Sequence, residues 1–165
     1  MSDYLCREMT ADDAESVLSI FNHYVKNSFA AYPEQPVGPE FFAVLMKASA
    51  GYPRLVAVDQ TDTVVGFAML RPYHPMPAFA ATAEISSFIA PSHTGHGIGQ
   101  ILLDRLIAGA RAKGITNIMA GISGYNEPSI KFHRKHGFVE CGKFLGIGRK
   151  RGMNFDVVWM QLHLD

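Results

Sequence analysis

Apolar positions recur along the chain with two different periods, and each change of period marks where a helix or a strand is expected. One helix with a buried face is indicated by the spacing of Val17, Ile20, Phe21, Tyr24 and Val25. Thr10 followed by Asp13 resembles a capping box at the start of this helix. Proline favours the first turn of a helix, and glycine often follows the last turn. These signals predict further helices over about residues 39–51, 99–113 and 128–137.

Seven shorter apolar runs predict strands at residues 5–9, 55–59, 64–70, 82–90, 117–122, 138–144 and 156–163. Glycines and basic residues at 146–152 predict a long turn between the last two strands, with 149–151 as a solvated tip. The order of elements predicts an α/β (α+β) fold, a mixed sheet with helices on both faces. At 165 residues the chain is expected to form one domain over 1–165.

Composition excludes several classes of protein. The formal net charge is zero and no long basic run occurs, which argues against a nucleic-acid partner. No apolar run reaches the roughly 18 residues that a membrane span needs. Residues 1–8 lack the apolar region of a signal peptide. Cys6 and Cys141 are interpreted as reduced thiols, so we expect a cytoplasmic protein without a membrane partner.

Three alternating glycines, Gly95, Gly97 and Gly99, stand between a predicted strand and a predicted helix. Such a turn leaves backbone N–H groups unpaired, and these groups, with the positive end of the helix dipole, suit a phosphate. A P-loop would need Lys and then Ser or Thr where Gln100 and Ile101 stand. A dinucleotide fingerprint would need glycine in place of Gln100 and an acid near position 119, and both are missing. An acyl-CoA loop and a plain flexible turn remain.

A second spacing pattern follows in the next predicted helix and consists of Asn126, Ser129, His133, Gly137 and Phe138. The two patterns together resemble signatures of the GNAT acetyltransferases. In the first signature Arg or Gln is followed by two residues, Gly, one residue, and Gly or Ala, and residues 94–99 fit it except that Thr94 stands first. In the second, a proton donor, usually Tyr, comes seven residues after the Asn, at the position of His133.

Nearly the whole chain is similar to one branch of that family, the phosphinothricin and methionine sulfoximine acetyltransferases. The similarity rests on a Glu-containing strand, the His at the Tyr position, and the segments 21–24 and 148–161. It implies the GNAT fold, a mixed central sheet of about six to seven strands flanked by about four helices. It also implies acetyl transfer from acetyl-CoA to the primary amine of a small molecule, an amino acid or its analogue, by direct attack. It implies no metal, and it suggests a homodimer.

Two residues are expected to move protons. Glu84 stands in an otherwise largely apolar strand, where a charge needs a reason. An alkyl amine has a pKa near about 10.4 and arrives charged, so a carboxylate could attract it and remove its proton. The resemblance assigns His133 to protonating the leaving thiolate. A surface glutamate and a histidine that only packs on its helix are the alternatives.

The resemblance also implies which residues surround the two substrates. Backbone groups on the strand before the loop would pair with the pantetheine arm, and one N–H there is an oxyanion donor. The residues expected to bind acetyl-CoA are Ser87, Phe88, Ile89, Gly95, His96, Gly97, Ile98, Gly99, Gln100, Asn126 and Ser129. Those expected to line the amine pocket are Phe29, Tyr32, Tyr73, His74 and Phe79.

Two features leave the acceptor open. Phe79 stands near a place where the branch often has Tyr, and Arg71 is the nearest guess for a group that binds a substrate carboxylate. A protein or peptide amine is an alternative acceptor, and it would need an open groove. A non-catalytic acyl-CoA sensor is a second alternative.

His133 and His136 share a helix face, but no Cys or carboxylate with suitable spacing joins them, so no zinc site is expected.

Overall fold

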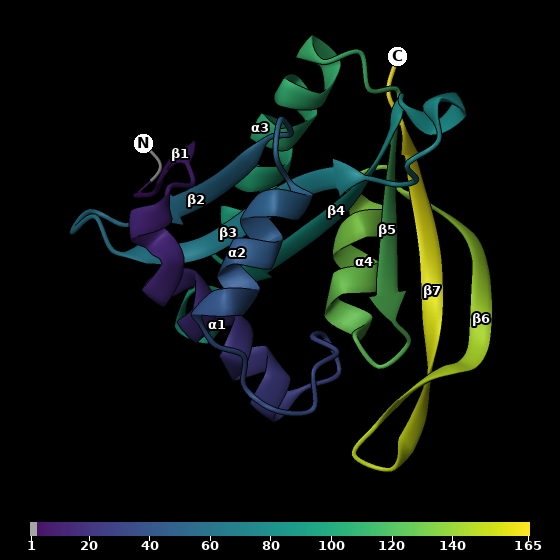
Figure 1. The fold of residues 1–165 in the computed structure, drawn as a ribbon, viewed down its shortest axis with the longest axis horizontal. Coiled ribbons are helices and arrows are strands. Elements are labelled where there is room, and N and C mark those ends of the chain that lie inside the picture. The colour runs from purple at the N-terminus through teal and green to yellow at the C-terminus, as the bar shows by residue number, and fades with distance from the viewer. Residues whose placement is uncertain (1–2) are drawn as a thin grey trace.

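The computed structural model describes residues 3–165; Met1 and Ser2, from the N-terminal segment considered above, lie outside the described residues. Within this range one seven-stranded sheet has the order β1-β2-β3-β4-β5-β7-β6 (Figure 1). Its strands are β1 (Leu5–Glu8), β2 (Arg54–Val58), β3 (Val64–Pro72), β4 (Thr82–Ile89), β5 (Asn117–Ser123), β6 (Val139–Lys150) and β7 (Met153–His163). The helices are α1 (Ala14–Asn27), α2 (Pro39–Ala48), α3 (Ile98–Ala112) and α4 (Glu127–Lys135). The predicted mixed sheet and its order of elements are confirmed.

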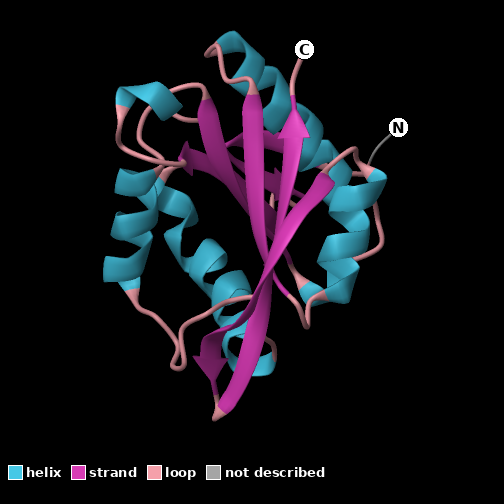
Figure 2. Cartoon of the chain, turned by 90° about the vertical axis from the view of Figure 1, so that its right-hand side faces the viewer, coloured by secondary structure: helices cyan, strands magenta, loops and turns pink. Residues whose placement is uncertain are grey.

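Helices flank the sheet on both sides (Figure 2). One buried cluster joins α1 and α2 to the sheet, and it contains the stripe predicted for the first helix, with Val17, Ile20, Phe21 and Val25 buried and Tyr24 partly buried. A second cluster joins α3 and α4 to the other face. Each amphipathic helix thus buries its apolar side on the sheet. Among residues 3–165, no helix has the length and apolar character needed to cross a membrane.

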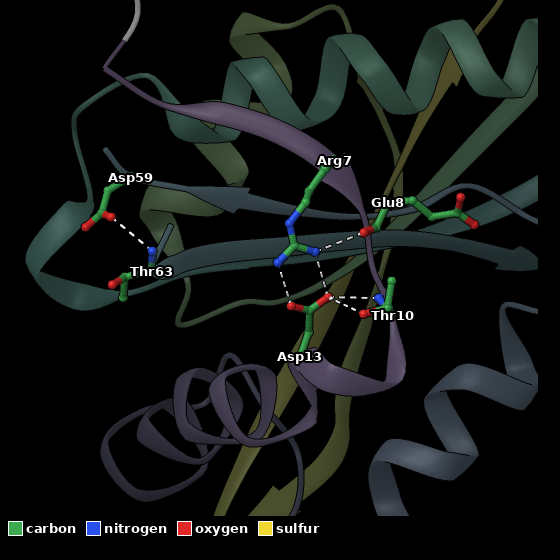
Figure 3. A network of polar contacts seen from close by, with 6 residues as sticks. All are labelled: Arg7, Glu8, Thr10, Asp13, Asp59 and Thr63. Atoms are coloured by element: carbon green, nitrogen blue, oxygen red, sulfur yellow. Dashed lines mark hydrogen bonds and ion pairs between the residues drawn. The ribbon is translucent and has the colours of Figure 1, made fainter. Parts of the chain in front are cut away.

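The start of α1 is fixed to β1 by a buried carboxylate (Figure 3). Asp13 accepts two bonds from the guanidinium of Arg7, at 2.9 and 2.8 Å, and one from the backbone N–H of Thr10, at 2.8 Å. The bonds from Arg7 lower the pKa of the Asp13 carboxyl. The predicted capping box is confirmed. In the same view the N–H of Thr63 donates to Asp59 across the β2–β3 turn.

β4 and β5, the one parallel pair among the described strands, are paired over three positions only. The pairing runs from Thr82 opposite Asn117 to Glu84 opposite Met119. β4 continues beyond this point and stays paired with β3 as far as Ile89 opposite Gly66. The two halves of the sheet therefore separate at Glu84, and the remainder of β4 has its β5 side unpaired.

The predicted long turn at 146–152 is wrong. β6 and β7 continue through it, and the turn consists of Arg151 and Gly152, with φ of 51° and 74°. Positive φ at both positions is what a two-residue hairpin turn requires. The other glycines of the segment lie in β6 at an irregularity in its pairing with β7, between Phe144 and Gly148. A bulged edge strand and a long turn share this glycine-rich composition.

The predicted solvated tip at 149–151 is also wrong for its central residue. Lys150 is fully buried, with an exposed fraction of 0%, although it lies next to the turn. Its ammonium donates to the backbone carbonyls of Val25, Ser28 and Ala31, at 2.8, 2.7 and 2.7 Å. These acceptors belong to the end of α1 and the loop after it, so the tip packs against the rest of the protein.

Candidate active site

The glycine-rich segment forms an exposed loop that leads into α3. Gly95 and Gly97 have φ of 79° and 81°, a left-handed conformation that favours glycine. Ile101 makes the bond from the first turn of α3, donating to the carbonyl of Gly97 at 3.2 Å. The N–H groups of residues 98–100 therefore have no acceptor within the helix, and the helix dipole adds positive potential. This end of α3 suits a phosphate group.

The side chains of this loop bond within the loop itself. Thr94 donates its hydroxyl to the carbonyl of Pro91 at 3.1 Å. The ring of His96 bonds to the carbonyl of Thr94 at 3.0 Å. Thr94, which stands where an Arg or Gln was expected, thus stabilises the turn. The groups that the loop offers to a ligand are mainly its backbone amides.

The unpaired side of β4 continues the same surface. The N–H of Ala90 donates to the carbonyl of Val65 in β3 at 2.8 Å, which fixes the alternation along the strand. By that alternation the backbone groups of Phe88 face β3, and those of Ser87 and Ile89 face the side that β5 has left. The Tyr24 hydroxyl donates to the Ile89 carbonyl at 2.5 Å, and burial raises the pKa of Tyr24.

The first turn of α4 holds the second predicted motif. Asn126 caps the helix by accepting from the N–H of Ser129 at 3.4 Å. The helix lies against the start of α3, where a Cβ on Gly99 would come within 3.1 Å of the Phe132 ring. The structure therefore brings the two predicted cofactor motifs onto neighbouring helices, although the side chain of Asn126 is engaged in the cap.

His133 is buried within that helix, with an exposed fraction of 4%. Its Nδ1 donates to the carbonyl of Ser129 at 2.7 Å, and its ring packs edge-on against Phe132 and Phe138. Burial is the main reason that the pKa of His133 is lowered. Because a carbonyl only accepts, the neutral ring has its proton on Nδ1, and Nε2 carries a lone pair. A proton donor at Nε2 would require the charged ring that burial disfavours.

Glu84 lies where β4 parts from β5, and it forms an ion pair that the sequence did not indicate. Its Oε1 accepts from Arg71, directly opposite on β3, at 2.7 Å. The same guanidinium donates to the hydroxyl of Ser86 at 2.5 Å. Both charged side chains are partly exposed, at 30% for Arg71 and 21% for Glu84. The register of the β3–β4 hairpin was the one signal that could have paired them.

The predicted pocket aromatics form two groups. The ring centroids of Phe29 and Tyr32 lie 5.7 and 5.4 Å from the centroid of the Phe155 ring of β7. Phe29 also contacts Tyr125. Burial raises the pKa of Tyr32, the charge of Glu84 raises it further, and Arg71 opposes this. The phenol of Tyr32 therefore lies within electrostatic range of the ion pair. Sequence reasoning missed Tyr125 and Phe155, which carry no local signal.

The second aromatic group lies on the loop between β3 and β4. His74 packs on Phe79 at 4.9 Å and Tyr73 packs on it at 6.0 Å. Tyr73 and Phe79 are each 42% exposed, so this group leaves much of its apolar surface open. The N–H of Tyr73 donates to Thr82 at 3.3 Å, which fixes the group to the start of β4.

One depression in the described part of the chain lies away from these groups. It has a volume of about 260 Å³ and lies between α4 and the β6–β7 hairpin, with Glu127, Arg134, Lys143 and Asp156 among its lining. Across the described chain, three or more His, Cys, Asp or Glu side chains do not gather in an arrangement that could hold a metal ion.

Comparison with known proteins points to one family. A family model described as the acetyltransferase (GNAT) family matches residues 17–138. An L-methionine sulfoximine/L-methionine sulfone acetyltransferase of Pseudomonas paraeruginosa is 36% identical over 96% of this chain and 94% of its own. A phosphinothricin N-acetyltransferase of Streptomyces coelicolor is 32% identical over 91% of this chain and 90% of its own. A phosphinothricin acetyltransferase from Sinorhizobium meliloti, solved in complex with acetyl-CoA, superposes with a TM-score of 0.92 at 31% identity, covering 98% of this chain and 89% of that one.

The burial of His133 predicts how its contribution to stability depends on pH. Its pKa in the folded protein lies below the value of about 6.5 in the unfolded chain, so the unfolded chain binds the proton more readily. Neutral His133 therefore makes its full contribution to the free energy of unfolding above the unfolded-state pKa, and this contribution is lost as the pH falls below it. We expect His133→Gln to lower the free energy of unfolding by about 1–3 kcal/mol at pH 7.5, with the gap narrowing toward pH 5.

Urea unfolding of wild type and variant at several pH values measures this gap, the difference between their free energies of unfolding. His136→Gln is the matched control, because it removes a second imidazole whose Nδ1 bonds to a backbone carbonyl of the same helix, that of Phe132. A gap of constant size for His133→Gln, or equal narrowing for both variants, would contradict the assignment.

Proposed function

The chain belongs to the acetyltransferase (GNAT) family, and from this membership we propose that it moves the acetyl group of acetyl-CoA to the primary amine of a small molecule, an amino acid or an amino-acid analogue. It is an acetyl-CoA-dependent N-acetyltransferase. One juxtaposition carries the proposal: the glycine loop at the start of α3 follows directly on the strand that loses its parallel partner at Glu84. The named relatives act on methionine sulfoximine, methionine sulfone and phosphinothricin, all small amines.

The described residues fit acetyl-CoA. The diphosphate would be held by backbone N–H groups of the loop and of the first turn of α3, over residues 95–100. Ser87 and Ile89 would pair with the pantetheine arm through the groups that face away from β3. Asn126 and Ser129 line the adjacent start of α4. Bound acetyl-CoA supplies the acetyl group as a reactive thioester.

The chain's own residues provide the remaining chemistry. The incoming ammonium is attracted to the Glu84 carboxylate, which removes its proton directly or through water so that the amine can attack. Arg71 holds that carboxylate in place through Oε1. A backbone N–H on the open side of β4 stabilises the developing oxyanion. His133 is the proposed acid for the thiolate; because its neutral ring has a lone pair on Nε2, it would first take up a proton there, such as the one released by the amine, and then pass it to the thiolate.

The acceptor is proposed to lie against Phe29 and Tyr32 on one side and against Tyr73, His74 and Phe79 on the other. The first pair is supported by the electrostatic coupling of Tyr32 to Glu84 and Arg71. The exposure of Tyr73 and Phe79 favours a second candidate, a protein or peptide amine, because such an acceptor needs an open surface. We place the enzyme in the cytoplasm, since Cys6 and Cys141 are free thiols and disulfides are rare in that compartment.

Release of free CoA thiol tests the proposed function. The assay uses acetyl-CoA at mildly alkaline pH with methionine sulfone, methionine sulfoximine, phosphinothricin, common L-amino acids and a Lys peptide. We expect turnover with the small amines. Turnover with the Lys peptide alone would favour the second candidate, and acetyl-CoA binding without any turnover would favour a non-catalytic sensor.

Replacing the proposed base tests the chemical step. We expect Glu84→Gln to lower kcat by about 100-fold or more, because the ammonium loses its proton acceptor, and to leave the KM for acetyl-CoA within about twofold. Glu140→Gln is the control, since it removes an exposed carboxylate whose partner is Arg134, at 3.6 Å. A kcat for Glu84→Gln close to that of the control would rule out Glu84 as the base.

Backbone strain introduced at a glycine tests whether the loop before α3 holds the cofactor. Alanine at Gly97, where φ is 81°, costs about 1–2 kcal/mol and shifts the loop amides. We expect Gly97→Ala to weaken acetyl-CoA binding about tenfold in calorimetry. Gly114→Ala places similar strain, at φ of 75°, beyond the other end of α3. Equal weakening by both variants would show that the loop amides do not hold the cofactor.

A homodimer is the further part of this proposal. β6 is an edge strand, and its hairpin exposes large apolar side chains at Val139, Phe144, Leu145, Ile147 and Met153. Exposed apolar surface of this kind is typical of an interface. We expect sedimentation equilibrium to give twice the 18.1 kDa chain mass, and Leu145→Arg to give the monomer. Val44→Arg, at an exposed apolar position on α2, is the control; a monomeric wild type would refute the dimer.

A further inference from the structure

Lys150 is a buried cation that the proposed chemistry does not use. An ammonium group has three hydrogens, and all three are donated to carbonyls, those of Val25, Ser28 and Ala31. Burying a charge is costly unless it is fully hydrogen-bonded. The cost here is offset by three charge-assisted bonds, so the arrangement specifies where these carbonyls lie.

The three carbonyls belong to one segment, the end of α1 and the start of the loop that leads to α2. Val25 lies in the last turn of α1, whose carbonyls lack partners within the helix and carry the negative end of its dipole. Arg151 adds to the same attachment, because its guanidinium donates to the carbonyls of Val25 and Lys26 and its N–H donates to Glu34 at 3.0 Å. Figure 1 shows the hairpin tip beside the end of α1.

The segment held in this way carries the aromatic wall of the proposed acceptor site. The Lys150 ammonium lies 5.9 Å from the centroid of the Phe29 ring. One residue after the last of the three carbonyls comes Tyr32, which stacks on Phe155 and is coupled electrostatically to Glu84. Lys150 therefore touches the loop and not the reacting groups, and its influence on them passes through Phe29 and Tyr32.

The attachment also spans the two halves of the sheet. Lys150 lies on β6, in the half that contains β5 and β7. α1 belongs to the other half, since the Tyr24 hydroxyl binds the Ile89 carbonyl of β4. The halves are joined at one end by the three paired positions of β4 and β5, and Lys150 joins them again at the hairpin tip.

We propose that Lys150 is a positioning residue for the amine acceptor: its ammonium holds residues 25–31 across the opening between the two sheet halves and so sets where Phe29 and Tyr32 stand relative to Glu84. This inference rests on the proposed acetyl transfer for its kinetic consequence. Its structural content, that the ammonium fixes the loop, does not depend on which amine is used.

The test compares Lys150→Met with wild type in two measurements. Using L-methionine sulfone as the acceptor probe, we expect the KM for the amine to rise about tenfold or more while the KM for acetyl-CoA stays within about twofold. In hydrogen exchange, we expect faster exchange across residues 26–38 and unchanged exchange across α3. Lys143→Met, at an exposed lysine of the same strand, is the matched control and should change neither result.

Several outcomes would overturn the proposal. An unchanged KM for the amine in a folded Lys150→Met protein would do so, as would equal acceleration of exchange in residues 26–38 and α3, which indicates general destabilisation. If Lys150→Met does not fold, Arg151→Ala removes bonds to the same helix end from a more exposed residue and is judged by the same two criteria, with smaller changes expected. If wild type acetylates no amine, the proposed function fails, and the exchange comparison alone decides the role of Lys150.

Discussion

The short pairing between β4 and β5 is the constraint on which the arrangement of this protein depends. Two parallel strands that stay together for three positions and then part leave one side of β4 without backbone partners. Unpaired backbone groups are costly in a protein interior, so the open side must meet solvent, a side chain or a ligand. The Tyr24 hydroxyl donates to the Ile89 carbonyl, and the backbone groups of Ser87 face the side of β4 that is not paired with β5. The glycine loop begins just after this stretch, which puts the amides proposed to bind phosphate and the unpaired edge of β4 on one continuous path.

The two halves of the sheet are connected again at a distance from their short pairing. The β6–β7 hairpin makes this connection, because it is long enough for its tip to reach the end of α1. A buried lysine suits this role better than an apolar contact would. Apolar packing is not directional, whereas an ammonium with three carbonyl acceptors fixes both the distance and the orientation of the segment it binds. The two-residue turn at Arg151 and Gly152 keeps the tip compact enough to be buried against that segment.

Sequence reasoning reached the elements and the motifs because both are local signals. The 3.6-residue period placed α1, Pro39 marked the first turn of α2, and the glycines placed the loop before α3. It failed at the C-terminal hairpin for an equally physical reason. Glycine and basic residues occur both in long turns and in bulged edge strands, and the burial of Lys150 depends on carbonyls that lie 119 to 125 residues earlier in the chain. The ion pair of Arg71 and Glu84 was missed because it follows from the register of β3 and β4, which no single residue determines.

That ion pair limits how Glu84 can act as a base. One carboxylate oxygen, Oε1, is engaged by Arg71, while among residues 3–165 no hydrogen bond engages Oε2. Each carboxylate oxygen has two lone pairs, but Oε2 is the one without a hydrogen bond, so the amine of the proposed reaction can reach it while the guanidinium stays in place and also donates to Ser86. The guanidinium of Arg71 has further N–H groups, and these could donate hydrogen bonds to a substrate carboxylate. Arg71 thus holds Glu84 in position, and whether the carboxylate serves as the proposed base depends on how closely the amine approaches Oε2.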